Sequence, residues 1–154
     1  MSGEVLHIHI APVADAEPKP VDSVRAEPGR GLEGDRYHAQ KGSYSGDGRS
    51  GREVTLIASE SIEALASEFG VKLAPGQSRR NITTRGIDLN DFVDRELRVG
   101  EVVLRGSRLC EPCQQLENNV GQANTLKGLV HRGGLRCEIV SGGTMRVGDE
   151  ISPA

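Results

Sequence analysis

Alternating apolar and polar residues near the N-terminus predict a β-strand over residues 4–10. Leu6, Ile8 and Ile10 fall on one side of this stretch, while His7 and His9 fall on the other. A period of two residues is typical of a half-buried strand. The histidines are therefore expected on an exposed or interfacial face. The stretch at residues 53–58, Glu-Val-Thr-Leu-Ile-Ala, predicts a second strand, which is expected to be buried.

The pattern changes to a helical one directly after this buried strand. Ile62, Leu65, Ala66 and Phe69 recur at the spacing of one helix face. Ser59 is the expected N-cap, because its hydroxyl could accept a hydrogen bond from the first turn. Gly70 is the expected C-terminal stop. This is the clearest helix that the pattern predicts.

The rest of the chain reads as short strands separated by glycine-rich turns. Further strands are expected at 21–26, 80–85, 96–110 (two strands around Gly100), 135–140 and 144–147, the last two as a hairpin; short helices or turns are expected at 87–92, 112–118 and 124–131, and a long loop at 28–52. Strands and helices do not alternate, which disfavours a doubly wound parallel sheet. The expected fold is a single domain over residues 1–154, mostly β, with a closed or partly closed barrel.

Composition and charge narrow the class of protein further. The net charge is −3, so an electrostatic nucleic-acid binder is not expected. No apolar run approaches the roughly 20 residues of a membrane helix, and the N-terminus lacks a signal-peptide pattern. Three cysteines exclude a full disulfide framework. A cytoplasmic location with reduced thiols is the simplest expectation.

The Cys110-Glu-Pro-Cys113 segment is the strongest local signal for chemistry. Two cysteines form only half of a structural zinc site, and Cys137, His38 and His131 lack paired spacing to complete it. No βαβ pattern supports a thioredoxin-like pair. Two interpretations remain: both thiols are buried as small apolar groups, or Cys113 is a reactive thiolate that binds a soft metal or carries sulfur.

Three segments could bind an anion. A glycine turn at 31–37 presents Asp35 and Arg36; the segment 79–86 carries Arg80, Asn81 and Arg85; Arg132 precedes the Gly133-Gly134 pair. Arginine binds planar oxyanions through two parallel hydrogen bonds, and paired glycines expose backbone N–H groups. A charged surface turn, a solvated strand face and a helix stop explain the same three segments without a ligand.

These segments occur in an order that resembles the MOSC domain, the C-terminal module of molybdenum-cofactor sulfurases. The matching stretches are Gly31-Leu-Glu-Gly-Asp-Arg-Tyr37, Arg80-Asn-Ile-Thr-Thr-Arg-Gly-Ile-Asp-Leu89, Leu97-Arg-Val-Gly-Glu-Val102, Pro112-Cys113-Gln-Gln-Leu116, Arg132-Gly-Gly-Leu-Arg136 and Val147-Gly-Asp149. The resemblance implies a small stand-alone member with a mostly antiparallel, pyruvate-kinase-like β-barrel. In the family, an apolar residue follows the hallmark cysteine one position earlier than Leu116 does here.

The resemblance also implies a molybdenum cofactor (molybdopterin) site with Cys113 as catalytic residue and metal ligand. Arg36, Arg80, Arg85 and Arg132 are the cations available to its phosphate. Asn81 could orient the pterin, and Asp35 is grouped with these cofactor-binding residues. Cys110 corresponds to a variable upstream thiol.

The function expected from this resemblance is reduction of N-hydroxylated or related N-oxygenated small molecules. An external electron-donor protein is required, because no flavin, haem or iron–sulfur signature is present. Cys113 could instead carry a persulfide received from a cysteine desulfurase, or the barrel could be a non-catalytic binding module. Pyridoxal phosphate is expected only on a possible sulfurase partner, since none of the four lysines suggests a Schiff-base site.

Overall fold

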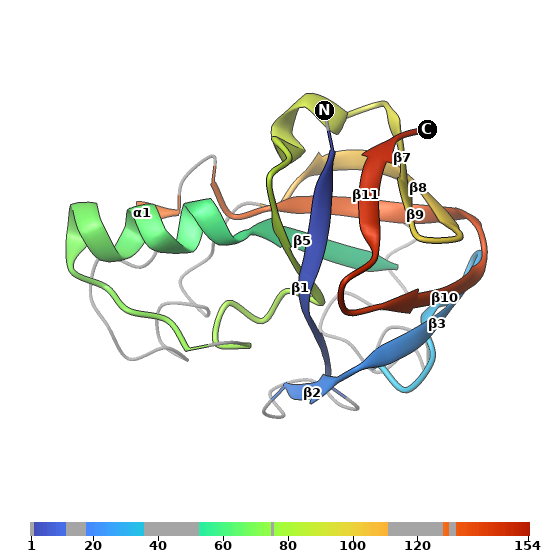
Figure 1. Ribbon diagram of the computed structural model, residues 1–154, viewed down its shortest axis with the longest axis horizontal. Coiled ribbons are helices and arrows are strands. Elements are labelled where there is room, and N and C mark those ends of the chain that lie inside the picture. The colour runs from blue at the N-terminus through green and yellow to red at the C-terminus, as the bar shows by residue number, and fades with distance from the viewer. Residues whose placement is uncertain (1, 12–17, 36–52, 75, 111–127, 130–131) are drawn as a thin grey trace.

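The protein is built around a closed β-barrel. The computed structural model describes residues 2–11, 18–35, 53–74, 76–110, 128–129 and 132–154. The elements are β1 (Gly3–Ile10), β2 (Lys19–Val21), β3 (Ser23–Glu27), β4 (Gly31–Leu32), β5 (Val54–Ala58), α1 (Ser59–Phe69), β6 (Ile82–Arg85), the 3₁₀ helix η1 (Leu89–Phe92), β7 (Glu96–Val99), β8 (Val102–Leu109), β9 (Leu135–Ser141), β10 (Gly143–Arg146) and β11 (Glu150–Pro153). Figure 1 shows α1 extending from one side of the barrel.

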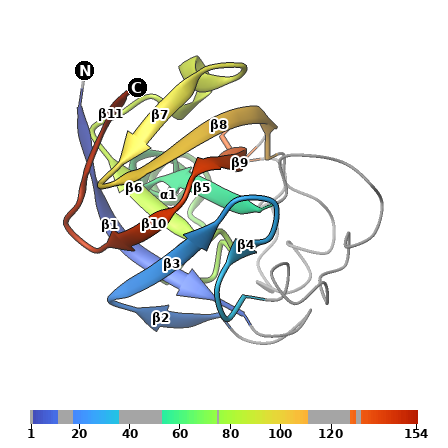
Figure 2. The ribbon, with the colours of Figure 1, turned by 90° about the vertical axis from the view of Figure 1, so that its right-hand side faces the viewer.

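Seven strands close the barrel in the order β1-β11-β7-β8-β9-β5-β6, and β6 returns to β1. Closure removes exposed sheet edges from this ring. The terminal strands β1 and β11 pair with each other, so the two ends of the chain lie side by side (Figure 1). A smaller sheet, β10-β3-β4, is seen at the front of Figure 2. The expected mostly β barrel is therefore confirmed.

One parallel pair interrupts the antiparallel barrel. Strands β5 and β6 are parallel, and α1 lies between them in the chain. Two neighbouring parallel strands cannot be joined by a tight turn. The chain must first return to the end of the sheet where the first strand began, and the segment that contains α1 makes this crossover. The sequence pattern gave no sign that the predicted helix and its flanking strands form a βαβ unit.

Two apolar clusters hold these elements together. Val54 and Leu56 point into the barrel, where the larger cluster fills the interior. Ile57 points outward from the same strand and packs with Leu65 of α1 and with Leu129. Strand β5 is therefore packed on both faces, which confirms the predicted buried strand. The helix has its own contact surface on the barrel wall.

The helix begins one residue earlier than the capping pattern predicts. Ala58 occupies the N-cap position without a side-chain hydrogen bond, and Ser59 is the first helical residue. The Ser59 hydroxyl donates to Oε1 of Glu60 at 3.2 Å, so it is engaged within the first turn. The prediction that Ser59 is the N-cap is therefore wrong. Gly70 ends the helix in a left-handed conformation (φ 69°), as predicted.

The predicted alternation in β1 holds from His7 to Ile10 but fails at Leu6. Ile8 and Ile10 pack in the barrel core, and His7 is exposed. Val5 and Ile8 are the residues buried in the barrel, and the register against β6 shifts between Val5 and His7. An odd spacing between two inward residues requires such an irregularity, because a regular strand repeats every two residues. His9 follows Ile8 on the outer face, as predicted, but it is buried there at 3% exposure.

Strand β10 does not form the predicted hairpin with β9. It pairs with β3 of the small sheet, from Gly143↔Ala26 to Arg146↔Ser23. Gly142 makes this crossing possible, since a Cβ there would lie 2.7 Å from the carbonyl oxygen of Ala26. The predicted strand at 21–26 is likewise divided between β2 and β3, which belong to different sheets.

Candidate functional site

Asn81, directly before β6, is the centre of a buried hydrogen-bond cluster that we call the Asn81 junction. Its Nδ2 donates to the carbonyl of His9 at 3.1 Å and to Oδ1 of Asp35 at 3.4 Å. Its Oδ1 accepts from the backbone N–H and the hydroxyl of Thr55, both at 3.1 Å. The N–H of Asn81 donates back to the Thr55 hydroxyl at 3.0 Å. One side chain thus joins β1, β5 and the turn at residue 35.

Asp35 completes the junction from the glycine turn of residues 31–35. It is 1% exposed, and its Oδ1 also accepts from the backbone N–H of Ala11 at 2.9 Å. The Asp35 N–H donates to the carbonyl of Leu32, which closes the turn. The carboxylate therefore faces the chain's own backbone. Contact of Asp35 or Asn81 with a cofactor stays a prediction.

Arg80 adds a second set of long-range contacts at the same place. Its Nε donates to the carbonyl of Gly133 at 2.8 Å, and its guanidinium also donates to the carbonyls of Cys110 (3.2 Å) and Ser78 (3.3 Å). Cys110 N–H donates in turn to the carbonyl of Gly134 at 2.7 Å. Arg80 thus fixes the end of β8 against the start of β9. Hydrogen bonds from a charged donor are the stronger kind.

Two predicted site residues lie outside the described residues. These are Cys113 and Arg36, together with the predicted helix at 112–118 and nearly all of the one at 124–131. Arg80 holds the residue three positions before Cys113. The structure therefore brings together Asp35, Arg80 and Asn81, from two of the predicted segments, beside the residue that leads to Cys113.

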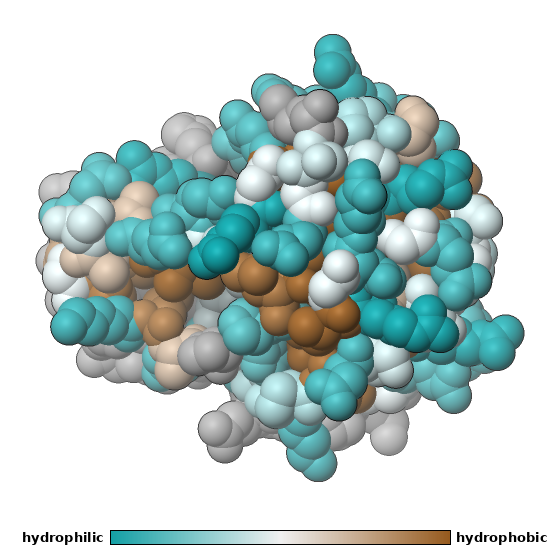
Figure 3. Space-filling model, viewed as in Figure 1, coloured by the Kyte–Doolittle hydropathy of each residue, from teal (hydrophilic) through white to brown (hydrophobic). Residues whose placement is uncertain are grey.

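The other two predicted cations do not join this cluster. Arg85 is exposed at the opposite end of β6 and lines a small hollow of about 220 Å³ with His7, Leu6, Ile62 and Leu73. Figure 3 shows apolar side chains gathered in a band between α1 and the barrel on this face.

Arg132 is held by helix α1. Its NH1 lies 2.6 Å from Oε2 of Glu68, and the two side chains are 41% and 50% exposed. The hydrogen bond and charge of Glu68 raise the pKa of Arg132 above its usual value. Exposed ion pairs of this kind contribute little stability. Whether Arg85 or Arg132 binds a ligand stays a prediction.

Two further arginines lie beside the Arg80 contacts and were not singled out from the sequence. Arg108 of β8 and Arg136 of β9 face each other in register, and Arg136 is also opposite Thr55 of β5. Their neighbours Leu109 and Leu135 belong to the barrel core, so both arginines point outward. The alternation of apolar and polar residues in the two strands was the sequence signal that could have shown these arginines to be outward-facing. Two neighbouring guanidinium groups on one surface suit an oxyanion.

His9 departs from the expected exposed histidine face. Its ring is covered where Gly76 approaches, since a Cβ at Gly76 would lie 2.8 Å from its Cδ2. Its Nδ1 has no hydrogen-bond partner among the described residues. Burial lowers the pKa of His9 below 6.5, and the nearby His7 lowers it further. The ring is therefore favoured in its neutral form.

The two described cysteines are buried free thiols. Cys110 is 2% exposed and Cys137 is fully buried. Burial, followed by the neighbouring Cys110 and Glu138, raises the pKa of the Cys137 thiol far above its usual value. A thiol with a raised pKa is a poor nucleophile and metal ligand. Among the described residues, no group of three or more His, Cys, Asp or Glu side chains could hold a metal ion.

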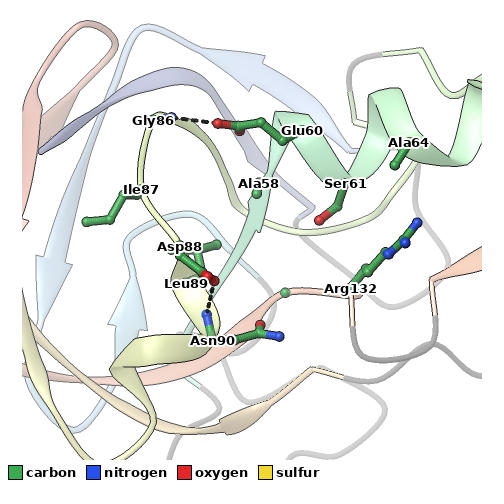
Figure 4. Close-up of a pocket in the computed structure, with 11 residues that line it drawn as sticks. Ala58, Glu60, Ser61, Ala64, Gly86, Ile87, Asp88, Leu89, Asn90 and Arg132 are labelled. Carbon is green, nitrogen blue, oxygen red and sulfur yellow. Dashed lines mark hydrogen bonds between the residues drawn. The ribbon is translucent and has the colours of Figure 1, made fainter. Parts of the chain in front are cut away.

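A cavity of about 550 Å³ lies between α1, η1 and residues 132–134, and we call it the α1–η1 cleft. Its lining residues are Ala58, Glu60, Ser61, Ala64, Gly86, Ile87, Asp88, Leu89, Asn90, Arg132 and Gly134. Figure 4 shows Ser61 and Asn90 reaching toward this space from opposite walls. The Gly134 wall accepts the hydrogen bond from Cys110, so the cleft adjoins the Arg80 contacts. Its size suits a small organic ligand.

Comparison with known proteins identifies the class of protein. The chain matches the MOSC domain family over residues 35–152. This match covers most of the chain, and the protein therefore belongs to the MOSC domain family. No helix in the described part of the chain is long and apolar enough to cross a membrane. No curated protein matches the chain.

Solved structures share the same fold at low sequence identity. YuaD from Bacillus subtilis is 18% identical, with a TM-score of 0.82 over 98% of this chain and 94% of that one. YiiM from Geobacillus stearothermophilus is 14% identical, with a TM-score of 0.75 over 99% of this chain and 75% of that one. YiiM from Escherichia coli is 18% identical, with a TM-score of 0.72 over 100% and 70%. These likenesses establish the fold.

Proposed function

We propose that this protein binds a molybdenum cofactor through the Cys113 thiolate and reduces N-hydroxylated small molecules. A separate electron-donor protein would supply the electrons. The observation that carries the proposal is membership of the MOSC family, with the matched range containing Pro112-Cys113. Cys110 and Cys137 are buried, which leaves Cys113 as the candidate ligand.

The donor set fits such a group. A thiolate is a soft ligand suited to a dithiolene-bound metal, and Arg108 with Arg136 offers two adjacent cations to the cofactor's phosphate. When bound, the cofactor supplies two-electron transfer and accepts the oxygen atom of the substrate. Pyridoxal phosphate has no proposed place here and would belong to a sulfurase partner.

The described residues of this chain would hold the backbone beside the proposed cofactor site in place. Arg80 holds the Cys110 and Gly133 carbonyls together, which fixes the backbone that leads to Cys113. Asn81 and Asp35 fix the adjoining strands. Rigid support of this kind keeps a ligand in the geometry that the reaction requires. Arg80 is a positioning residue in this account.

The proposal is tested by activity of the cofactor-loaded protein. Wild type is expected to reduce an N-hydroxylated amidine with reduced benzyl viologen as donor, and Cys113→Ala is expected to lose at least 100-fold. Arg108→Gln with Arg136→Gln should lower cofactor retention, whereas Arg98→Gln, on an exposed strand position away from this rung, should not. Loaded wild type without reductase activity would contradict the proposal.

Persulfide transfer would use the same thiolate in another way. Incubation with a cysteine desulfurase would then add about one sulfur atom to wild type but not to Cys113→Ala. That mass gain, together with absent reductase activity, would favour the sulfur-carrier function. Neither property in either assay would favour a non-catalytic binding module.

A further inference from the structure

We propose that the α1–η1 cleft is the substrate site and that it selects neutral or cationic nitrogen compounds over carboxylates and phosphates. As a substrate site the cleft rests on the proposed function, but its binding preference is a property of the described residues alone. The inference starts from the charges that line the cleft and from which of them are already balanced.

Glu60 cannot attract a ligand cation strongly, because the protein already uses its carboxylate. Oε2 accepts from the backbone N–H of Gly86 at 2.8 Å, and Oε1 accepts from the Ser59 hydroxyl. Burial opposes ionisation of Glu60, but these hydrogen bonds and the nearby Arg85 outweigh it and lower its pKa. The same carboxylate occupies the positive end of α1. A ligand anion at this end of α1 would therefore be repelled by the Glu60 carboxylate.

Arg132 does not make the cleft basic. Its guanidinium forms the close ion pair with Glu68, and Figure 4 shows its side chain directed along α1, away from the η1 wall. An incoming carboxylate or phosphate would have to compete with Glu68 for it. The charges of Arg132 and Glu68 therefore balance each other.

Asp88 is the third charged residue of the described cleft lining, together with Glu60 and Arg132. One of its oxygens, Oδ1, accepts from the backbone N–H of Asn90 at 3.2 Å and caps η1. Asp88 makes no ion pair with any residue that the structure describes. Its second carboxylate oxygen can accept a hydrogen bond from a ligand N–H group. Among the described lining residues, Asp88 is thus the carboxylate that keeps an oxygen for a ligand.

The other walls suit a small planar molecule with polar edges. Ala58, Ala64 and Gly134 are small, so they leave room for a ring, while Ser61 adds a hydroxyl toward the space (Figure 4). Apolar walls with a few directed polar groups are typical of ligand sites. The lining thus suits an amine or amidine with an aromatic or cyclic body.

Three nearly isosteric probes test the charge preference: benzamidine (cation), benzamide (neutral) and benzoate (anion). Binding to the full-length chain without molybdenum is followed by amide chemical shifts, with Ser61, Gly86 and Asn90 as reporters. We expect benzamidine to bind most tightly and benzoate most weakly. Asp88→Asn keeps the capping oxygen, and it should weaken benzamidine about fivefold while changing benzamide less than twofold.

Matched controls separate the cleft from general surface charge. Asp91→Asn removes the same charge from η1 outside the lining and should leave benzamidine binding within twofold. Ala64→Phe should fill the cleft and abolish binding, whereas Ser67→Phe on an exposed turn of α1 should not.

Benzoate binding as tightly as benzamidine, equal effects of Asp88→Asn and Asp91→Asn, or undetectable binding of all three probes would overturn the proposal. The test is independent of Cys113. Benzamidine binding in the cleft, combined with no molybdenum in the native protein, would refute the proposed function and leave the ligand preference standing.

Discussion

The Asn81 junction and the α1–η1 cleft use polar side chains in opposite ways. In the junction, Asn81 and Asp35 are buried and hydrogen-bonded to the chain's own groups. In the cleft, Ser61, Asp88 and Asn90 line an open space. The junction therefore gives rigidity, and we propose that the cleft gives recognition. A polar residue in a family motif is thus not by itself a ligand contact.

The substitution Asn81→Leu is expected to have the largest effect, and it tests the difference between the junction and the cleft. The substitution should lower the free energy of unfolding by about 3 kcal/mol or more, because it leaves the Thr55 N–H and the His9 carbonyl buried without their partner. Urea unfolding measures the effect. Asn90→Leu in the cleft is the matched control and should cost less than about 1 kcal/mol. Equal costs at both positions would refute the distinction.

The substitution Arg80→Met is expected to have the next largest effect on the free energy of unfolding. It keeps the aliphatic stem and removes the three hydrogen bonds to carbonyl groups, so the free energy of unfolding should fall by about 2–3 kcal/mol. Arg85→Met, at the exposed end of β6, should change it by less than about 0.5 kcal/mol. A loss for Arg80→Met no larger than for Arg85→Met would show that these carbonyl contacts do not stabilise the fold.

His9 gives the junction a pH dependence near neutral pH. Its pKa is lowered in the folded protein from 6.5, so the unfolded chain binds its proton more readily. The free energy of unfolding should therefore decrease as the pH falls below about 6.5, by at most ~1.4 kcal/mol per pH unit. Denaturation between pH 5 and 7 measures this slope. It should flatten in His9→Gln and persist in His7→Gln; an unchanged slope in His9→Gln would assign it elsewhere.

The smallest expected effect belongs to the rim of the cleft. Arg132→Gln breaks the ion pair with Glu68, yet both side chains are substantially exposed. The free energy of unfolding should change little, and less still in high salt. Thermal unfolding at low and high salt checks this. A loss of several kcal/mol would mean that the cleft wall is structural, like the junction.

The sequence predicted most elements of the fold but not their partners. Periodicity identified β5, α1, and the β7 and β8 strands around Gly100, because local patterns determine these elements. It missed the burial of His9 and the pairing of β10 with β3, since the approach of Gly76 and a change of sheet depend on distant segments. Local spacing carries no such information.

The candidate site shows the same division. Of the predicted cofactor-binding residues, the structure brings Asp35, Arg80 and Asn81 together through hydrogen bonds and adjacency. Their use of backbone partners was not visible in the sequence. Arg108 and Arg136 were missed because each sits in an ordinary strand, and only the register aligns them.

The most direct test of the central claim is the molybdenum and pterin content of anaerobically purified protein. Wild type from cells that make the cofactor should contain both, in similar amounts per chain. Cys113→Ala should contain neither, while Cys110→Ala, which alters the buried neighbouring thiol, should retain them if folded. Wild type without molybdenum and pterin, or a Cys113→Ala variant that retains both, would contradict the account.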